Sequence, residues 1–566
     1  MMVVAEAGIE QAARACDGRR QRTRWASARR AQVDRLVDDF GAGRIGRRQF
    51  LGRSAALGLS LPAASALMAA CGGATAGANG GNLHLAPGNV VTLDPAFVDG
   101  EIDIANAIFE GLVAFKQNTY DLGNVLAETI EQSPDGLSVH FTLKQGIQFH
   151  HGFGEVTAED VKFSFERMAG LSTPKVETYF KDDWSALRSV EVKSKYEGVL
   201  HMKEPYGPLF RTTLPGTAGW VMSKRAYEEM GPKKIKLHPI GTGKYQFKEV
   251  LPQQRSVLER APNYSGASDA VYGEGKAGFK ELTFVYVPAN QALEAAMQTG
   301  ELEYIDASIT EWNHLKGDGR FKSATHPLFD LGFIGMNTVN PVLRDINVRR
   351  AIRAAIDRKT IFEVLSFGIG RLTTGFVPPE MGIGYWKDAP DYAQDLDAAE
   401  GYMRAAGVSS MSVDFNYGPD PGSSKLAELI QGDLAKIGIK LVLKPDINFG
   451  TPGPSLKTNG LFVGFYSVPF PDPSWLYVWF TKSQIGQYNY MNWDDPTFNK
   501  LYHESTVETD PKQRDAVFIE MAKRIDEAAI VLPTAWGDAY GIYNADVVQP
   551  AWAPNGRPLY AAFKAV

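Results

Sequence analysis

Residues 46–73 constrain this chain most, because they separate a leader from the part that folds. The adjacent Arg47 and Arg48 precede a 17-residue run, residues 54–70, that is apolar or small and carries no charge. Cys71 follows directly after two alanines. The run is shorter than the roughly 20 apolar residues that a membrane-spanning helix needs, and such a segment is typical of a processing signal. We therefore expect the fold to begin after Cys71.

The same stretch predicts where the protein is delivered. Arg47 and Arg48 have the layout of a twin-arginine export signal, and the small residues before Cys71 resemble a lipobox. Residues 1–71 are therefore predicted to be an export leader that ends at a lipid-modified Cys71. We expect an extracytoplasmic, lipid-anchored protein that touches the membrane only through its tether or leader. The alternative is an uncleaved N-terminal anchor.

The remainder of the chain is long enough for several domains. Residues 72–82 contain no large side chain and predict a flexible tether. The body that follows has roughly 490 residues, which corresponds to two to four domains. A hydrophobic content of 44% is enough to fill a large core.

Charge and cysteine content exclude several function classes. Residues 1–53 hold 12 Arg against six acidic residues, so the total charge of −6 leaves −12 on the rest of the chain. An acidic body argues against binding to nucleic acid. Cys16 and Cys71 are the only cysteines, and both precede the body. Structural disulfides, cysteine metal sites and thiol catalysis are therefore excluded there.

Motifs for catalysis and metal binding are missing. The chain has no G-x-S-x-G, H-E-x-x-H or G-x-x-x-x-G-K-[ST] sequence. The nine His are scattered, and the one adjacent pair, His150 and His151, is expected at the edge of a hairpin rather than at a metal. We therefore predict no enzyme, no cofactor and no resident metal. An exported hydrolase is the remote alternative, and it would need a nucleophile–base pair.

The second half of the body predicts an α/β fold. Residues 411–417 alternate between apolar and polar like a strand, and residues 423–436 have the apolar spacing of a helix. Gly438 fits the position that ends such a helix, and residues 439–443 again predict a strand. A strand–helix–strand unit of this kind builds a parallel sheet.

Three further local structures are expected from pattern alone. Residues 141–143 and 147–149 flank a Lys-Gln-Gly turn and predict a hairpin. Thr157, with Asp160 three residues later, predicts a capped helix start. Residues 345–365 predict a single amphipathic helix.

Aromatic residues beside Pro and Gly are the main indication of a binding site. Three prolines in residues 469–473 exclude a regular helix or central strand, so irregular backbone is expected to present the aromatics of residues 465–480. For each aromatic taken singly, burial in the core is the competing interpretation. The candidate ligand-binding residues are Phe97, Trp220, Trp386, Phe465, Tyr466, Ser467, Asp472, Trp475 and Tyr490.

Several segments, taken in order, carry a family resemblance. They are LDPAF (93–97), IFEGL (108–112), the stretch 134–168, HPIGTGKYQF (238–247), DINVRRAIRAAIDRKTI (345–361), AKIGIKLVL (435–443) and FPDPSWLY (470–477). Together they resemble family 5 of the extracytoplasmic solute-binding proteins, which serve dipeptide, oligopeptide and nickel ABC importers. The resemblance covers about residues 83–550.

This resemblance implies an α/β, two-lobed, periplasmic-binding-protein-like clamp with mixed sheets. Its implied parts are lobe one at residues 83–327 plus 535–566, an extra subdomain of lobe one at about 106–215, lobe two at 328–534, and hinge crossovers near 328–336 and 530–536. Ligand would bind between the lobes.

The implied function is that of an import receptor. It would capture peptides or peptide-like solutes and deliver them to ABC permease subunits in the membrane, whose partner ATPase drives import. The receptor would act as a monomer and bind no nucleic acid. Receptors for an opine, an oligosaccharide or a nickel chelate are the alternatives within the family.

One position departs from what the family implies. In oligopeptide-binding members an acidic residue just before the Asp-Pro segment receives the peptide amine, whereas residues 468–470 here hold no carboxylate. Asp472 is one substitute. Ligands with a blocked or absent amine, or with a different polar head, are the other expectations.

Overall fold

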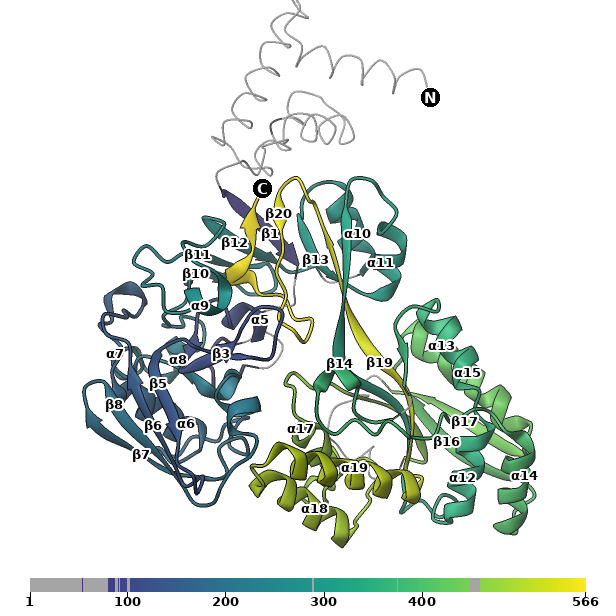
Figure 1. The fold of residues 1–566 in the computed structure, drawn as a ribbon. Helices are drawn as coiled ribbons and strands as arrows, with labels where there is room; N and C mark the ends of the chain where they lie inside the picture. The colour runs from purple at the N-terminus through teal and green to yellow at the C-terminus, as the bar shows by residue number, and fades with distance from the viewer. Residues whose placement is uncertain are drawn as a thin grey trace, which may run out of the picture.

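The computed structural model describes residues 53, 80–86, 90, 92–98, 102–287, 290–373, 375–446 and 459–566 (Figure 1). Arg47, Arg48 and Cys71, the residues of the predicted export signal and lipid anchor, lie outside this part. Within it, no helix combines the length and the apolar character needed to cross a membrane.

A large mixed sheet forms the framework of the molecule. Its strands, in spatial order, are β10 (Tyr245–Leu251), β11 (Arg255–Arg260), β12 (Glu281–Val285), β1 (Asn82–Ala86), β13 (Tyr304–Ala307), β19 (Val531–Tyr543), β14 (Lys322–Met336), β18 (Leu461–Tyr466), β16 (Met411–Tyr417) and β17 (Ile439–Pro445), with β15 (Arg371–Leu372) beside β19. The sheet contains parallel pairs, such as β1 with β12 and β16 with β17, and antiparallel pairs, such as β11 with β12 and β14 with β19. The predicted α/β class with mixed sheets is confirmed.

The long antiparallel strands β14 and β19 connect the two ends of this sheet. At one end, residues 322–327 of β14 pair with residues 538–543 of β19, which also pair with β13. At the other end, residues 331–336 of β14 pair with β18. In Figure 1 the two strands run between the part that holds β10–β12 and the part that holds α12–α19. They therefore connect the two parts of the molecule.

Glycines let aromatic rings lie flat on the sheet where β14 meets β18. Phe333 is paired with Gly464, and Gly335 with Phe462. A Cβ atom at Gly464 would lie 2.2 Å from the Phe333 ring, and one at Gly335 would lie 2.1 Å from the Phe462 ring. Only glycine leaves room for these rings, so the two pairs fix the register of β14 and β18.

The first part of the molecule carries its own core, which includes Trp184, Phe165 and Tyr245. Its four-stranded antiparallel sheet has the order β5 (Ala127–Gln132), β6 (Ser138–Leu143), β8 (Glu197–Met202) and β7 (Leu187–Ser194). The other elements of this part are α5 (Ile102–Ala105), β2 (Glu110–Gly111), β3 (Val113–Phe115), β4 (Leu122–Asn124), α6 (Ala158–Met168), β9 (Trp220–Val221), α7 (Lys224–Met230), α8 (Pro232–Ile235), α9 (Asp269–Tyr272), α10 (Asn290–Gln298), α11 (Ile309–Leu315), β20 (Val548–Gln549) and β21 (Lys564–Ala565).

Two further clusters of buried side chains fill the second part. One gathers around Phe333, Tyr466 and Phe518, and the other around Ile334, Phe415 and Leu434. The helices of this part are α12 (Ile346–Ala355), α13 (Arg358–Ser366), α14 (Leu396–Ala405), α15 (Pro421–Ala435), α17 (Ser474–Tyr477), α18 (Pro496–Val507) and α19 (Pro511–Ala528). Separate cores on either side of β14 and β19 agree with a two-lobed arrangement.

Two local predictions are confirmed. Helix α6 begins after Thr157, whose backbone N–H donates to the Asp160 carboxylate at 2.9 Å. The β16–α15–β17 unit is present with β16 and β17 parallel, and Gly438 ends α15 with a φ of 77°.

Two other local predictions are wrong. Residues 141–143 belong to β6 and pair with β5 and β8, while residues 147–149 form no strand with them. His150 and His151 therefore sit in a one-turn 3₁₀ helix instead of at a hairpin edge. The side chain of His150 is buried against the Gly243 carbonyl, at 2.9 Å, and this burial lowers its pKa to about 4.

The helix predicted over residues 345–365 is two helices. Ile356 adopts an extended conformation (φ −85°, ψ 125°), and Asp357 then caps α13 by accepting a hydrogen bond from the Thr360 backbone N–H. The Asp357 N–H donates to the Asp433 carboxylate on α15. Capping and this tertiary contact outweigh the helical periodicity of the sequence.

Candidate ligand-binding cleft

A pocket lies where the two parts of the molecule face each other. Its empty space, with the part open to solvent included, amounts to about 800 Å³. Residues 469, 470 and 475, which follow β18, form one side, and residues 102–120, 215–220 and 553–559 contribute to the other.

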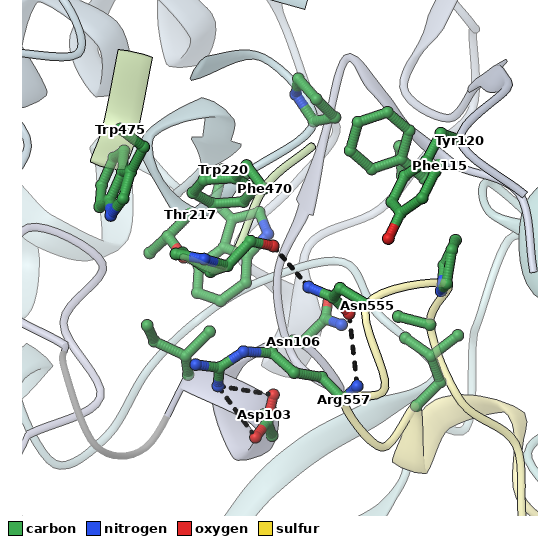
Figure 2. Close-up of a pocket in the computed structure, with 18 of the residues that line it drawn as sticks. Asp103, Asn106, Phe115, Tyr120, Thr217, Trp220, Phe470, Trp475, Asn555 and Arg557 are labelled. Atoms are coloured by element: carbon green, nitrogen blue, oxygen red, sulfur yellow. Dashed lines mark hydrogen bonds and ion pairs between the residues drawn. The ribbon is translucent and has the colours of Figure 1, made fainter. Parts of the chain in front are cut away.

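Seven of the 20 residues that line the pocket are aromatic. Trp220 on β9 stacks on Phe109 with 5.8 Å between ring centroids. Phe470 and Trp475 meet edge to face at 5.4 Å (Figure 2). Trp475 packs against the cores of both parts. Such walls offer flat apolar contact area to a ligand.

Tyr120 adds a polar group to this apolar surface. Its ring packs against Phe115 and against Phe329, which belongs to the buried cluster around Phe333. Its hydroxyl is buried and has no hydrogen-bond partner among the described residues. Figure 2 shows the oxygen turned toward the middle of the lining residues. A buried hydroxyl without a partner is costly, so a ligand that supplies one gains affinity.

One ion pair lies at the floor of the pocket. Arg557 Nη1 approaches the Asp103 carboxylate on α5 at 3.3 Å, and the two side chains are 31% and 23% exposed. Next to it, the Asn555 amide donates to the Pro469 carbonyl and accepts from the Arg557 backbone N–H at 3.3 Å (Figure 2). Asn555 therefore ties the C-terminal tail to the loop that follows β18.

The charges of two further carboxylates act on this ion pair. Asp306 on β13 accepts hydrogen bonds from the hydroxyls of Tyr304 and Tyr560, at 2.7 and 3.0 Å. Burial, with the charge of Asp103, raises the pKa of Asp306 to about 6. Asp330 on β14 accepts from the Val468 backbone N–H, and burial raises its pKa as well. The charges of Asp103, Asp306 and Asp330 all act to raise the pKa of Arg557.

Asp472 lies outside this pocket, in a separate charged cluster. Its fully buried carboxylate binds Arg514 on α19 through two hydrogen bonds of 2.8 and 3.0 Å. Arg211, from the opposite part of the molecule, approaches it at 3.3 Å and donates to the Pro471 and Met381 carbonyls. Asp472 therefore braces the loop after β18 and joins the two parts, as an Asp-Pro turn residue does.

The structure places two predicted residues, Trp220 and Trp475, in the pocket lining. The other candidates lie elsewhere in the described state. Phe97 lies beneath the Arg167 guanidinium, and Trp386 packs against the second core. Tyr466 and Tyr490 are buried in that core, Ser467 hydrogen-bonds Asp330, and Phe465 is 60% exposed.

The expectation that irregular backbone presents the aromatics of residues 465–480 is only partly right. Phe465 and Tyr466 belong to β18 and Trp475 to α17, so only Phe470 lies on the irregular loop. The prolines confine the irregular backbone to residues 467–473 and leave both flanks regular.

Sequence reasoning missed the polar residues of the pocket. Asp103 and Arg557 are 454 positions apart, and neither lies in a recognisable motif. Asn555-Gly556 is a turn signal that could have marked the tail segment. Nothing local showed that this turn faces α5.

Comparison with known proteins agrees with the architecture. The model of the bacterial extracellular solute-binding proteins, family 5 (middle region), matches residues 121–487. The chain belongs to this family. A probable di/tripeptide-binding protein of Pseudomonas aeruginosa is 26% identical over 478 residues, which are 80% of this chain and 89% of that protein. A putative ABC transporter peptide-binding protein of Brucella ovis is 26% identical over 88% of this chain and 95% of its own length.

A solved structure shares the two-lobed fold. The dipeptide-binding protein of a Pseudoalteromonas species, determined with Met-Leu, superposes with a TM-score of 0.74 at 21% identity. The match covers 86% of this chain and all of that one. The predicted two-lobed fold is thereby confirmed for this member of family 5.

Proposed function

We propose that this protein is the extracytoplasmic receptor of an ABC importer and captures peptides or peptide-like solutes between its lobes. The observation that carries the proposal is the aromatic pocket with opposite charges at its floor, built from both sides of the β14–β19 connection. The relatives named as peptide-binding proteins support the ligand class. The role is binding and delivery to a membrane permease, without catalysis.

Lobe closure is the mechanism that this architecture supports. We assign lobe one to residues 83–327 plus 535–566, with the extra subdomain at about 106–215, and lobe two to residues 328–534. A ligand favours the closed state only through contacts that it makes better there. Trp220 from lobe one and Trp475 from lobe two face the same pocket, so a ligand held between them stabilises closure.

Native mass spectrometry tests the proposed function. We expect the full-length protein, purified without denaturation, to carry a discrete added mass that is released on denaturation and identified as a peptide. The same spectrum should show a monomer. A sugar, an opine or a nickel complex as the released species would contradict the peptide class, and conversion of an added peptide into products would contradict the role of a binder.

Export and anchoring belong to the same proposal. We infer that residues 1–71 direct export through Arg47 and Arg48 and that Cys71 is lipid-modified. The double substitution of Arg47 and Arg48 to Lys should abolish delivery, because the export machinery reads the two guanidinium groups. Cell fractionation checks this, with Arg44→Lys as the matched control. Undiminished delivery of the double variant would contradict the twin-arginine interpretation.

A further inference from the structure

A short segment of the first part of the molecule reaches across to the second part. Residues 205–216, here called the crossing segment, contain the π-helix η2 (Leu209–Thr213), a rare conformation that often occurs at functional sites. Leu209 anchors the segment in the core of the first part. Two other residues of the segment, Gly207 and Arg211, contact the second part of the molecule.

Gly207 lets the backbones of the two parts meet. Its N–H donates to the Thr506 carbonyl at the end of α18, at 2.8 Å. A Cβ atom at Gly207 would lie 2.3 Å from the Glu508 carbonyl oxygen and 2.7 Å from Arg514 Nε. Both of these atoms belong to the second part, so a larger residue at position 207 would push the two parts away from each other.

Arg211 makes the second set of contacts between the parts. Its Nε donates to the Pro471 carbonyl at 3.0 Å, and its Nη2 donates to the Met381 carbonyl at 3.2 Å. Its guanidinium also lies 3.3 Å from the Asp472 carboxylate. The five N–H donors of a guanidinium have a fixed geometry, so one arginine can bind all three groups at once.

The arrangement of charges allows this contact to break at low cost. Asp472 is fully buried and keeps Arg514, which is 2% exposed, as its partner when Arg211 leaves. Arg211 itself is 36% exposed, so water can solvate its guanidinium again. Separation of the two parts therefore leaves no buried charge without a partner, which would be the costly outcome.

All partners in these contacts belong to the chain itself. Gly207 and Arg211 are not among the described residues that line the pocket. Phe470, which precedes the acceptor Pro471, does line it, and so does Gly216 at the end of the crossing segment. A Cβ atom at Gly216 would lie 2.4 Å from the Phe470 ring. The contacts of the crossing segment therefore also bring an aromatic wall of the pocket into place.

We propose that the crossing segment acts as a latch, whose contacts through Gly207 and Arg211 hold the two parts together without a ligand. Because the contacts are reversible, they set the ratio of closed to open protein. The consequence for binding rests on the proposed function: the apparent affinity for a solute falls in proportion to the fraction of binding-competent protein. A solute that enters between the parts then does not have to supply the whole free energy of closure.

Small-angle X-ray scattering of the full-length protein tests the latch in the absence of ligand. Native mass spectrometry first establishes that no solute is bound. Arg211→Ala, which removes contacts, and Gly207→Ala, which inserts a methyl group between the parts, should both increase the radius of gyration over wild type. The leader is the same in all samples, so the differences report on the body.

Two matched controls accompany these variants. Arg188→Ala removes an exposed arginine of β7, and Gly317→Ala adds a Cβ atom that meets no atom within 4 Å. Both should scatter like wild type. An unchanged radius in both latch variants, or an equal increase in the controls, would overturn the proposal.

Hydrogen exchange of ligand-free wild type decides the question even where a variant fails to fold. The Gly207 amide, resolved by overlapping peptides, should exchange at least about 10-fold more slowly than in an unfolded chain, because the Thr506 carbonyl holds its proton in the closed form. Exchange of this amide at the unfolded rate would overturn the latch.

Binding measurements separate the latch from the proposed function. The probe is a pool of the dipeptides formed from Ala, Leu and Phe. Arg211→Ala and Gly207→Ala should bind this pool roughly 10-fold more weakly than wild type if the closed fraction falls to about a tenth, while the controls bind it like wild type. Unchanged affinity in both latch variants would overturn the role of the latch in binding and leave the proposed function intact. Absence of binding by wild type would overturn the proposed function, whereas scattering and hydrogen exchange would still decide on the latch.

Discussion

Replacing Asp472 by alanine should lower the free energy of unfolding by about 3–5 kcal/mol, the usual cost of leaving a buried charge without its partner. Arg514 is only 2% exposed, and its guanidinium makes two hydrogen bonds to Asp472. Arg211 would lose the same carboxylate. Urea denaturation of wild type and variant measures the difference. Loss of this cluster also loosens the contact between Arg211 in the first part of the molecule and the loop after β18.

A matched control separates burial from charge. Asp494 pairs with Lys482 at the surface, where the two side chains are 36% and 70% exposed. Asp494→Ala should therefore cost less than about 1 kcal/mol. Equal losses in the two variants would contradict a structural role for the Asp472 cluster.

The contribution of Asp472 to the free energy of unfolding should also depend on pH. Burial by itself would raise the pKa of Asp472, but Arg514, Ser474 and Arg211 outweigh it and hold the pKa below its ordinary value. A carboxyl group with a lowered pKa stabilises the fold above the pKa of the unfolded state, and that contribution is lost as the pH falls through the folded pKa. The stability difference between wild type and Asp472→Ala should therefore narrow below about pH 4.

Local patterns predicted the elements whose causes are local. The capped start of α6 depends on Thr157 and Asp160, three residues apart. The β16–α15–β17 unit follows from periodicity and a helix-ending glycine. The break at Ile356 could not be predicted in this way, because it depends on Asp433, 76 positions along the chain.

In the candidate site, too, residues with a local signal were predicted and residues brought together only by the fold were not. Trp220 and Trp475 were found because aromatics beside Pro and Gly are a local signal. Asp103 and Arg557 were missed because only the folded chain brings α5 and the tail together. The Pro-rich segment was recognised, yet Asp472 within it proved to be a buried brace. Composition indicates that a segment carries binding residues, but not which side chain faces the ligand.

Glu110→Gln should remove a pH dependence from the stability of the first part of the molecule. Glu110 on β2 is 5% exposed, and its carboxylate accepts hydrogen bonds from the hydroxyls of Thr242, at 2.7 Å, and Tyr264, at 3.4 Å. Burial raises its pKa from 4.5 to about 7, although these hydroxyls, Ser268 and the charge of Lys244 oppose the shift. At neutral pH the fold therefore bears part of the cost of an ionised buried carboxylate.

The direction in which stability changes with pH follows from the protons that Glu110 binds in the folded and unfolded states. Between pH 4.5 and pH 7 the folded state keeps a proton on Glu110 that the unfolded state has lost, so stability falls as the pH rises through this window. A shift of this size corresponds to roughly 3 kcal/mol. Glu110→Gln should match wild type near pH 4.5 and exceed its free energy of unfolding by up to about 3 kcal/mol at pH 8. The exposed Glu204→Gln is the control and should follow wild type at every pH. Urea denaturation at several pH values measures the free energy of unfolding of wild type and Glu110→Gln. If the two proteins show the same dependence on pH, the carboxylate of Glu110 is ionised throughout this range. Lys244 and the surrounding hydroxyls would then suffice to hold its charge.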